Sequence, residues 1–138
     1  MVFRDLDHRD LYNKILEKMK SKSAEHRATA YLLAFDNVLH EHVDEVFDFE
    51  EDWFILESMN KPFQTSSSRR TMRLAMNLWG GYCGEEEIID EDGNKINVAS
   101  ADYSPYYLFD SSYSYYYCQA ILMVFNSDGD IIMDRRWQ

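Results

Sequence analysis

The sequence is poor in cysteine, proline and glycine, and it contains no long apolar run. Its 138 residues include two cysteines, two prolines and five glycines. Cys83 and Cys118 do not make a disulfide framework, which favours a reduced, cytoplasmic protein. No run of about 18 apolar residues occurs, so we expect no transmembrane helix. The opening stretch MVFRDLDHRD is charged from Arg4 onward and has no apolar signal core, so we expect no secretion.

Basic residues are also scarce, because 14 Lys and Arg stand against 25 Asp and Glu, a formal net charge of −11. Non-specific nucleic-acid binding relies on cations, so this balance argues against direct contact with nucleic acid. The acids are gathered in two groups. The first acidic block consists of Glu41, Asp44, Glu45, Asp48, Glu50, Glu51, Asp52 and Glu57. The second acidic block consists of Glu85, Glu86, Glu87, Asp90, Glu91 and Asp92.

The length is that of one domain, 1–138, and the apolar pattern of its first half is helical. We expect a first helix that begins at Asp5 or Asp7 and a second from about Ala24 to Phe35 with Ser23 as its N-cap. The segment from Leu39 to Phe47 has helical spacing and an acidic outer face. The short apolar run that follows, WFIL, reads as a strand or as a buried turn.

The stretch FQTSSSRRTMRLAMNLWGGY predicts a further helix that is capped by Ser66, Ser67 or Ser68. The pair Gly80-Gly81 ends it, because glycine accepts the left-handed conformation of a helix C-terminus. Three arginines lie near its start, although cations are disfavoured at the positive end of a helix dipole, and this conflict hints at a purpose. These arginines are Arg69, Arg70 and Arg73.

The last third of the chain gives a mixed pattern. The stretch EEEIIDEDGNKINV predicts a hairpin that turns at Asp92-Gly93-Asn94, or equally a mobile acidic loop. Ser104 followed by Pro105 predicts a helix start, and Ser112 is placed to cap a helix that reaches at least Ala120. The alternative is two β-rich runs around residues 127–129, with 131–133 as a short strand. The predicted fold is therefore a mainly α, compact single-domain helical bundle with a small C-terminal β-hairpin, and α+β is the alternative.

No arrangement of residues identifies a catalytic or metal site. In HEHVD, the residues His40, His42 and Asp44 do not share one helix face, and the sequence names no third ligand. Cys83 is not tied to a particular histidine, and NSDGD lacks the ligand spacing of a calcium loop. We therefore expect no catalytic residue, no metal and no cofactor, and an enzyme is the weakest of three functional hypotheses.

Tyrosine is concentrated in one short segment. Seven tyrosines and Phe109 fall between Tyr103 and Tyr117. A phenol buries a large apolar ring but needs a partner for its hydroxyl, so one interpretation is a core with a polar edge. The other is a binding surface, because tyrosine offers contact area at low cost in entropy.

Two motifs resemble those of a family of small uncharacterised bacterial proteins that also occur in phages and other mobile elements. That family carries W/F-Q-T-S leading into R-L-A-F-N-L-Y-N-G-Y, then Y-T-P-Y-x-L-F and S-Y-A-P-Y. The first motif matches here at Phe63, Gln64, Thr65, Ser66, Arg73, Leu74, Ala75, Asn77, Leu78, Gly81 and Tyr82. The second matches at Tyr103, Pro105, Tyr106, Leu108, Phe109, Ser112, Tyr113 and Tyr116.

The resemblance extends to FRDLDHRDLY and VFDFEE and covers the chain to about Ala120, whereas the tail NSDGDIIMDRRWQ departs from it. Tyr115 stands where the family has proline, which favours a longer last helix. The resemblance implies a structural role for Arg73, holding a carboxylate or a helix end, and it leaves Arg69 and Arg70 as surface residues. It implies no chemistry.

Two functional hypotheses follow. The first is an acidic accessory protein of a phage or mobile element that binds a basic protein stoichiometrically and inhibits a host protein that handles nucleic acid, for instance in defence. Its surface would consist of Glu41, Asp44, Glu45, Asp48, Glu50, Glu51, Asp52, Glu85, Glu86 and Glu87. The second is a binder of small anionic, nucleotide-like ligands. Its pocket would use Gln64, Thr65, Arg69, Arg70, Arg73 and Tyr103 or Tyr106. The sequence leaves the oligomeric state open.

Overall fold

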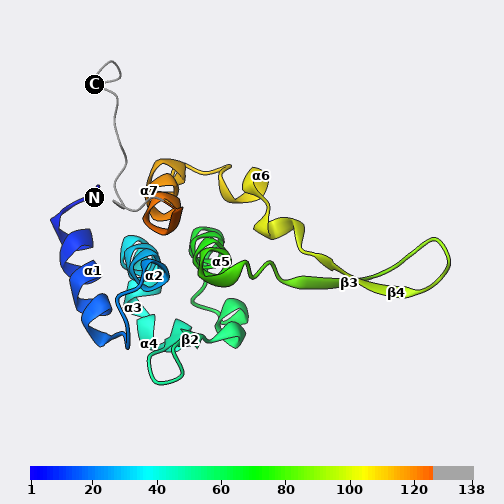
Figure 1. Ribbon diagram of the computed structural model, residues 1–138, viewed down its shortest axis with the longest axis horizontal. Coiled ribbons are helices and arrows are strands. Elements are labelled where there is room, and N and C mark those ends of the chain that lie inside the picture. The colour runs from blue at the N-terminus through cyan, green and yellow to red at the C-terminus, as the bar shows by residue number, and fades with distance from the viewer. Residues whose placement is uncertain (126–138) are drawn as a thin grey trace, which may run out of the picture.

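A bundle of helices forms the body of the protein. The computed structural model describes residues 1–125. Helix α2 packs against α1, α5 and α7 and lies at the centre of the bundle (Figure 1). The longer helices are α1 (Leu6–Lys18), α2 (Ala24–Phe35), α5 (Ser66–Gly80) and α7 (Ser114–Phe125). The shorter helical elements are α3 (Asn37–Glu41), α4 (Val43–Val46), η1 (Leu56–Asn60), η2 (Ala101–Tyr103) and α6 (Pro105–Leu108).

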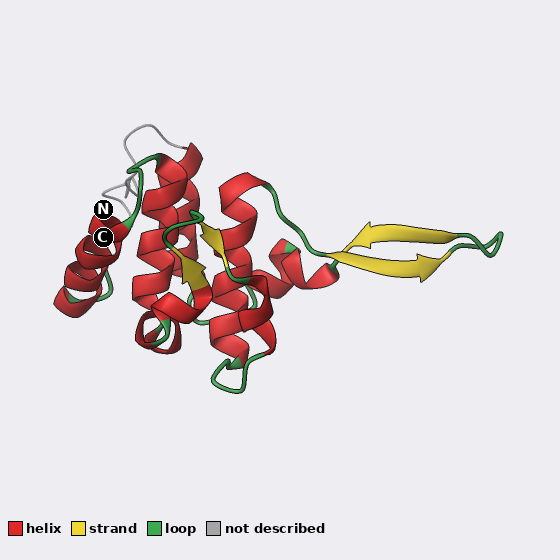
Figure 2. Cartoon of the chain, turned by 90° about the horizontal axis from the view of Figure 1, so that it is seen from below, coloured by secondary structure: helices red, strands yellow, loops and turns green. Residues whose placement is uncertain are grey.

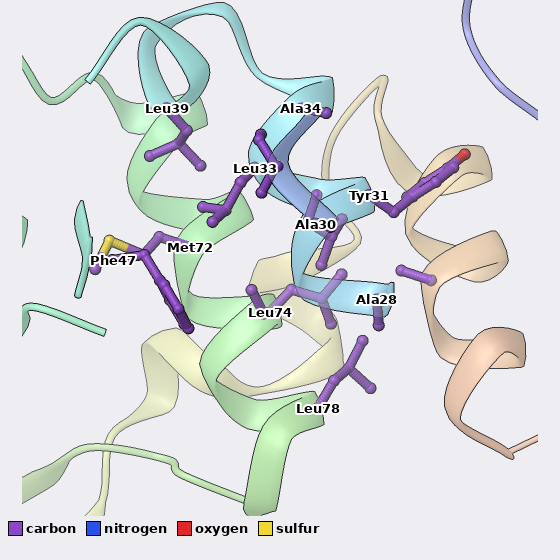
Figure 3. Packing of buried hydrophobic residues seen from close by; sticks show 14 of the residues in the cluster. Ala28, Ala30, Tyr31, Leu33, Ala34, Leu39, Phe47, Met72, Leu74 and Leu78 are labelled. Atoms are coloured by element: carbon purple, nitrogen blue, oxygen red, sulfur yellow. The ribbon is translucent and has the colours of Figure 1, made fainter. Parts of the chain in front are cut away.

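Helix α2 is buried because neighbouring helices cover it on several sides. Its residues Ala30, Leu32 and Leu33 have no exposed surface. Small residues such as Ala30 let a neighbouring helix approach closely, and the larger ones fill the grooves between helices. Figure 3 shows side chains of α2 and α5, among them Leu33 and Leu74, gathered between the two helices. The mainly α fold predicted from the sequence is thus confirmed.

The helix starts follow from capping side chains. The Asp5 carboxylate accepts a hydrogen bond from the His8 N–H at 2.7 Å, and the Ser23 hydroxyl caps α2, both as predicted. Helix α5 is different, because its N-cap is Thr65 and not one of the serines after it. The Thr65 hydroxyl accepts from the Ser68 N–H, while the Ser68 hydroxyl accepts from the Thr65 N–H. This reciprocal capping box places the N-cap one residue before the serine run, so that α5 begins at Ser66.

The segment from Leu39 to Phe47 was predicted as one helical stretch, and the structure divides it. Helix α3 ends at Glu41, His42 adopts a non-helical conformation (φ −115°, ψ 29°), and α4 is a single turn. Phe47 already belongs to strand β1 (Phe47–Asp48), which pairs in antiparallel fashion with β2 (Trp53–Phe54). The prediction failed because a stripe with helical spacing does not specify that its turns are continuous.

A second antiparallel hairpin consists of β3 (Glu85–Ile89) and β4 (Lys95–Ala99). It turns at the predicted place: the Asp90 N–H donates to the Asn94 carbonyl at 2.9 Å, and Gly93 has a φ of 82°. The hairpin points away from the helices along the long axis of the molecule (Figures 1 and 2). The alternative strands at 127–129 and 131–133 lie outside the described residues.

The tyrosine-rich segment contributes to both the core and the surface. Ser104 caps α6 with Pro105 at its first position, and α7 continues past Ala120 to Phe125. Tyr117 is fully buried, whereas the side chain of Tyr106 is 89% exposed. Among the described residues, no helix is long and apolar enough to cross a membrane.

Candidate functional site between the two acidic blocks

An open cavity of about 630 Å³ lies at the C-terminal end of α5, at the foot of the β3–β4 hairpin. None of its lining residues carries a charge. They are Trp53, Gly80, Gly81, Tyr82, Cys83 and Gly84. The cavity therefore combines two aromatic side chains, one thiol and exposed glycine backbone.

Two glycines shape this corner of the chain. Gly81 ends α5 in the left-handed conformation (φ 81°), and its N–H donates to the Asn77 carbonyl at 2.7 Å. Gly84 has a φ of 57°, and a Cβ atom there would lie 2.9 Å from a ring carbon of Tyr103. Both positions need glycine, Gly81 because of its backbone angle and Gly84 because of its backbone angle and its neighbour.

The aromatic wall of the cavity is held by other rings. The rings of Trp53 and Tyr82 meet nearly at right angles (75°), with centroids 6.3 Å apart. Trp53 also packs edge-to-face on Trp79, and Tyr82 packs edge-to-face on Tyr103. The Tyr82 carbonyl accepts a hydrogen bond from the Asn77 side chain at 3.2 Å. These contacts fix the orientation of both rings before any ligand arrives.

Two residues that line the cavity are direct sequence neighbours of the acidic blocks. Trp53 directly follows Asp52, and Gly84 directly precedes Glu85. Because Trp53 and Gly84 line the same cavity, the fold brings the chain next to Asp52 and the chain next to Glu85 to one place, although the two lining residues are 31 positions apart. Glu85 and Glu86 lie on β3 opposite Ala99 and Val98.

Part of the acidic charge is compensated locally. Asp44 pairs with Lys18 at 2.7 Å, Glu45 pairs with His42 at 2.8 Å, and Glu87 lies 3.7 Å from Lys95. The Asp48 carboxylate accepts from the backbone N–H groups of Glu50 and Glu51.

Beyond these pairs, Glu41, Glu50 and Glu51 are exposed to solvent. Exposed carboxylates of this kind add to the long-range potential even where a neighbouring pair does not.

Asp52 holds the loop of the first acidic block to the start of α2. Both of its carboxylate oxygens lie 2.9 Å from Nε2 of His26, whose Nδ1 lies 2.6 Å from the Ser23 hydroxyl. These three residue types also occur in hydrolases, but here Ser23 serves as a helix cap and none of the three lines the cavity. We interpret the group as a structural latch that positions Trp53.

The three arginines of α5 do not converge on one ligand site. Nε of Arg69 donates to the Met59 carbonyl at 2.9 Å, and Nε of Arg70 donates to the Tyr107 carbonyl at 3.2 Å. Both side chains are half-buried, unlike the surface position that the sequence suggested. Arg73 lies 3.6 Å from the Asp102 carboxylate, as expected for a structural arginine. The arginines therefore fasten η1, η2 and α6 to α5.

The other residues of the predicted anion pocket are dispersed. Gln64 is buried and accepts a hydrogen bond from the Ser68 hydroxyl, Thr65 is occupied as a cap, and Tyr106 projects into solvent. Arg73 and Tyr103 do share a smaller cavity of about 260 Å³ that adjoins the first at Tyr82 and Gly84. Burial raises the pKa of Tyr103 to about 12, so its hydroxyl stays protonated at neutral pH.

The structure gives the histidines of HEHVD separate partners. His40 contacts the Asn37 side chain at 3.2 Å, while His42 contacts Glu45 and stacks on Phe63. Among the side chains that the structure describes, no group of three or more from His, Cys, Asp or Glu is arranged to hold a metal ion.

Sequence reasoning did not find Trp53 and Tyr82. The sequence did contain a signal for them. Trp53 directly follows the acidic run EED, and the segment GGYCG, which contains Tyr82, directly precedes the acidic run EEE. That these two junctions meet in space is a property of the tertiary fold.

The chain belongs to DUF6075, a family of unknown function that matches residues 1–135. No protein with a curated description and no solved structure matches the chain.

Proposed function

We propose that this member of the DUF6075 family acts by stoichiometric binding of a protein partner with a basic surface. The observation that supports this most strongly is that Trp53 and Gly84 line one open cavity with an uncharged lining, and that Trp53 follows Asp52 of the first acidic block while Gly84 precedes Glu85 of the second. A basic patch that meets both blocks gains long-range attraction during approach and an uncharged contact area at the centre.

The partner class follows from the same charge distribution. Proteins that handle nucleic acid carry clefts shaped for rows of phosphates, and carboxylates in rows occupy such clefts. The protein is, in this proposal, a cytoplasmic accessory protein of a phage or mobile element that blocks a nucleic-acid-handling host protein such as a defence nuclease. The two free cysteines among the described residues are consistent with a reducing compartment.

The test is affinity capture from host lysate with the immobilised chain, followed by elution with increasing salt. We expect a basic protein in an equimolar complex that is released between about 50 and 500 mM salt, because screening weakens exposed charge pairs over that range. A lysate without any basic partner, or binding that salt does not change, would contradict the proposal.

Two double variants with the same change in net charge test whether the position of the acids matters for binding. Glu50→Gln with Glu51→Gln removes two exposed acids of the first acidic block, two and three residues before Trp53, and Glu17→Gln with Asp110→Asn removes two exposed acids elsewhere. We expect the first pair to weaken capture of the basic partner and the second to leave it nearly unchanged. Equal effects of the two pairs would mean that only net charge matters.

Binding of a small anionic ligand stays a second candidate, supported by the cavity that Arg73 and Tyr103 share. A nucleotide present at 100 times its Kd would stabilise the fold by about 2.7 kcal/mol and raise the Tm measurably. An unchanged Tm across a nucleotide panel would eliminate this candidate.

A further inference from the structure

We propose that the cavity at the end of α5 binds the guanidinium group of an arginine side chain of the partner. The proposal rests on the proposed function and deepens it, because it assigns an anchor point within the acidic surface. Three independent features of the cavity favour a cation: its aromatic wall, the helix end that it borders, and the acids beside it.

The aromatic wall offers a cation two ring surfaces. Trp53 and Tyr82 stand at 75° to each other, so they form a corner and not a flat wall. The faces of indole and phenol rings attract cations through their quadrupoles. The protein already uses this contact internally, since the guanidinium groups of Arg70 and Arg73 lie 4.9 and 5.5 Å from the centre of the Tyr107 ring.

The end of α5 adds negative potential to the same place. This 15-residue helix ends at Gly80 and has no basic residue in its last turn. A helix C-terminus carries roughly half a negative elementary charge, which attracts cations. Gly80 and Gly81 both line the cavity and have no side chain, so the end of the helix borders it with backbone alone.

The surroundings select a cation over an anion and favour arginine over lysine. Glu51 is exposed and lies two residues before Trp53, so its carboxylate adds negative potential to this region and disfavours an anion. A guanidinium group is flat and less strongly hydrated than an ammonium group, so it stacks on an aromatic ring at a smaller desolvation cost. Arg73, which lines the adjoining cavity together with Tyr82, is balanced by Asp102 at 3.6 Å.

The experiment uses the full chain and three peptides that differ at one kind of residue. The probe is a 12-residue peptide of alternating glycine and arginine, and its counterparts carry citrulline or lysine in place of arginine. Chemical shifts of the Trp53 indole N–H and the Tyr82 ring report on the cavity, and a titration gives each Kd. We expect the arginine peptide to shift both signals and to bind more tightly than the lysine peptide, whereas the citrulline peptide leaves both signals unchanged.

Two variants at Tyr82 distinguish the contribution of its ring to peptide binding from its contribution to folding. Tyr82→Leu removes one aromatic face and should weaken the arginine peptide by roughly 3- to 30-fold, the range for a cation–π contact. Tyr82→Phe keeps the ring and should retain nearly full affinity. Thermal unfolding of both variants verifies that they are folded.

The outcomes distinguish this inference from the proposed function. If the arginine peptide binds but leaves Trp53 and Tyr82 unchanged, or binds Tyr82→Leu as well as the wild type, the cavity assignment is wrong and the acidic-surface function stands. Equal binding of the lysine peptide would overturn the choice of guanidinium. If no cationic peptide binds and the lysate contains no basic partner, both proposals fail.

Discussion

The carboxylate of Asp52 contacts the imidazole of His26 through both of its oxygens, each 2.9 Å from Nε2. This pair joins the first turn of α2 to the turn between β1 and β2. Asp52 adopts a left-handed backbone conformation (φ 57°), and the His26 ring packs on Trp79 at 4.5 Å between centroids. The pair therefore fixes the residue that precedes Trp53, and with it one wall of the cavity.

Removing the His26 side chain should destabilise the protein. His26→Ala leaves Asp52 without its partner and removes a buried ring contact with Trp79, so we expect a loss of about 1–3 kcal/mol in the free energy of unfolding. Urea denaturation measures it. The control is His40→Ala, which removes only a contact with Asn37 on the surface and should change stability by less than about 0.5 kcal/mol. Equal losses would show that the latch contributes nothing.

Alanine at Gly84 should be more damaging than alanine at Gly93. Both positions have a positive φ, 57° and 82°, so either substitution introduces backbone strain of about 1–2 kcal/mol. At Gly84 the new Cβ would also lie 2.9 Å from the Tyr103 ring, whereas nothing lies within 4 Å at Gly93. The Tm of each variant is measured, and we expect the larger decrease for Gly84→Ala. A smaller decrease for Gly84→Ala than for Gly93→Ala would contradict the packing described at the foot of the hairpin.

Stability should fall as the pH decreases below about 6.5, and His8 should account for part of that fall. Burial lowers the pKa of His8 below its ordinary value of 6.5. Its Nδ1 accepts a hydrogen bond from the Arg4 N–H, while its Nε2 lies 2.9 Å from the Tyr31 carbonyl. The folded state therefore holds the neutral ring, and the unfolded chain takes up a proton first as the pH falls.

The measurement for His8 is the free energy of unfolding at several values between about pH 8 and pH 5.5, for the wild type and His8→Gln. We expect the wild type to lose stability more steeply toward acid than the variant, which is less stable at pH 8. Asn13→Gln, at an exposed position on α1 that carries no titratable group, is the control and should keep the wild-type slope. Parallel curves for wild type and His8→Gln would refute the role of His8.

Tyr117 and Tyr106 should respond differently to loss of their hydroxyl groups. The Tyr117 hydroxyl is buried and lies 2.7 Å from the Thr71 hydroxyl, and burial raises its pKa to about 12. Tyr117→Phe should therefore cost about 1 kcal/mol. Tyr106→Phe, at an 89% exposed position, should be neutral. Equal effects in chemical denaturation would show that this tyrosine segment is not divided between core and surface.

The sequence predicted those parts of the fold that depend on local signals. Asp5 and Ser23 are helix caps, the turn around Gly93 is a hairpin turn, and the glycines after Trp79 end α5. Each of these is determined by hydrogen bonds or backbone angles within a few residues. The N-cap of α5 was misplaced because two neutral side chains, Thr65 and Ser68, replace the more familiar capping pair with Glu or Gln.

The candidate site was only partly predictable because it depends on contacts between distant segments. The acidic blocks are visible in the sequence, but nothing local indicates that Trp53 and Gly84 line one cavity. The arginines were over-interpreted for the same reason. Carbonyl groups of Met59 and Tyr107, which lie ten and 37 residues from their arginine partners, occupy the guanidinium groups of Arg69 and Arg70.

We propose that exposed acids near the cavity at the end of α5, such as Glu50 and Glu51, concentrate negative potential around it. Paramagnetic relaxation by a cationic and an anionic nitroxide of equal size measures this potential at individual N–H groups. We predict that the cationic probe relaxes the Trp53 indole N–H and the Gly84 amide far more strongly than the anionic probe does, with a larger ratio than at Glu17 on α1. Equal ratios at the cavity and at Glu17 would contradict the account.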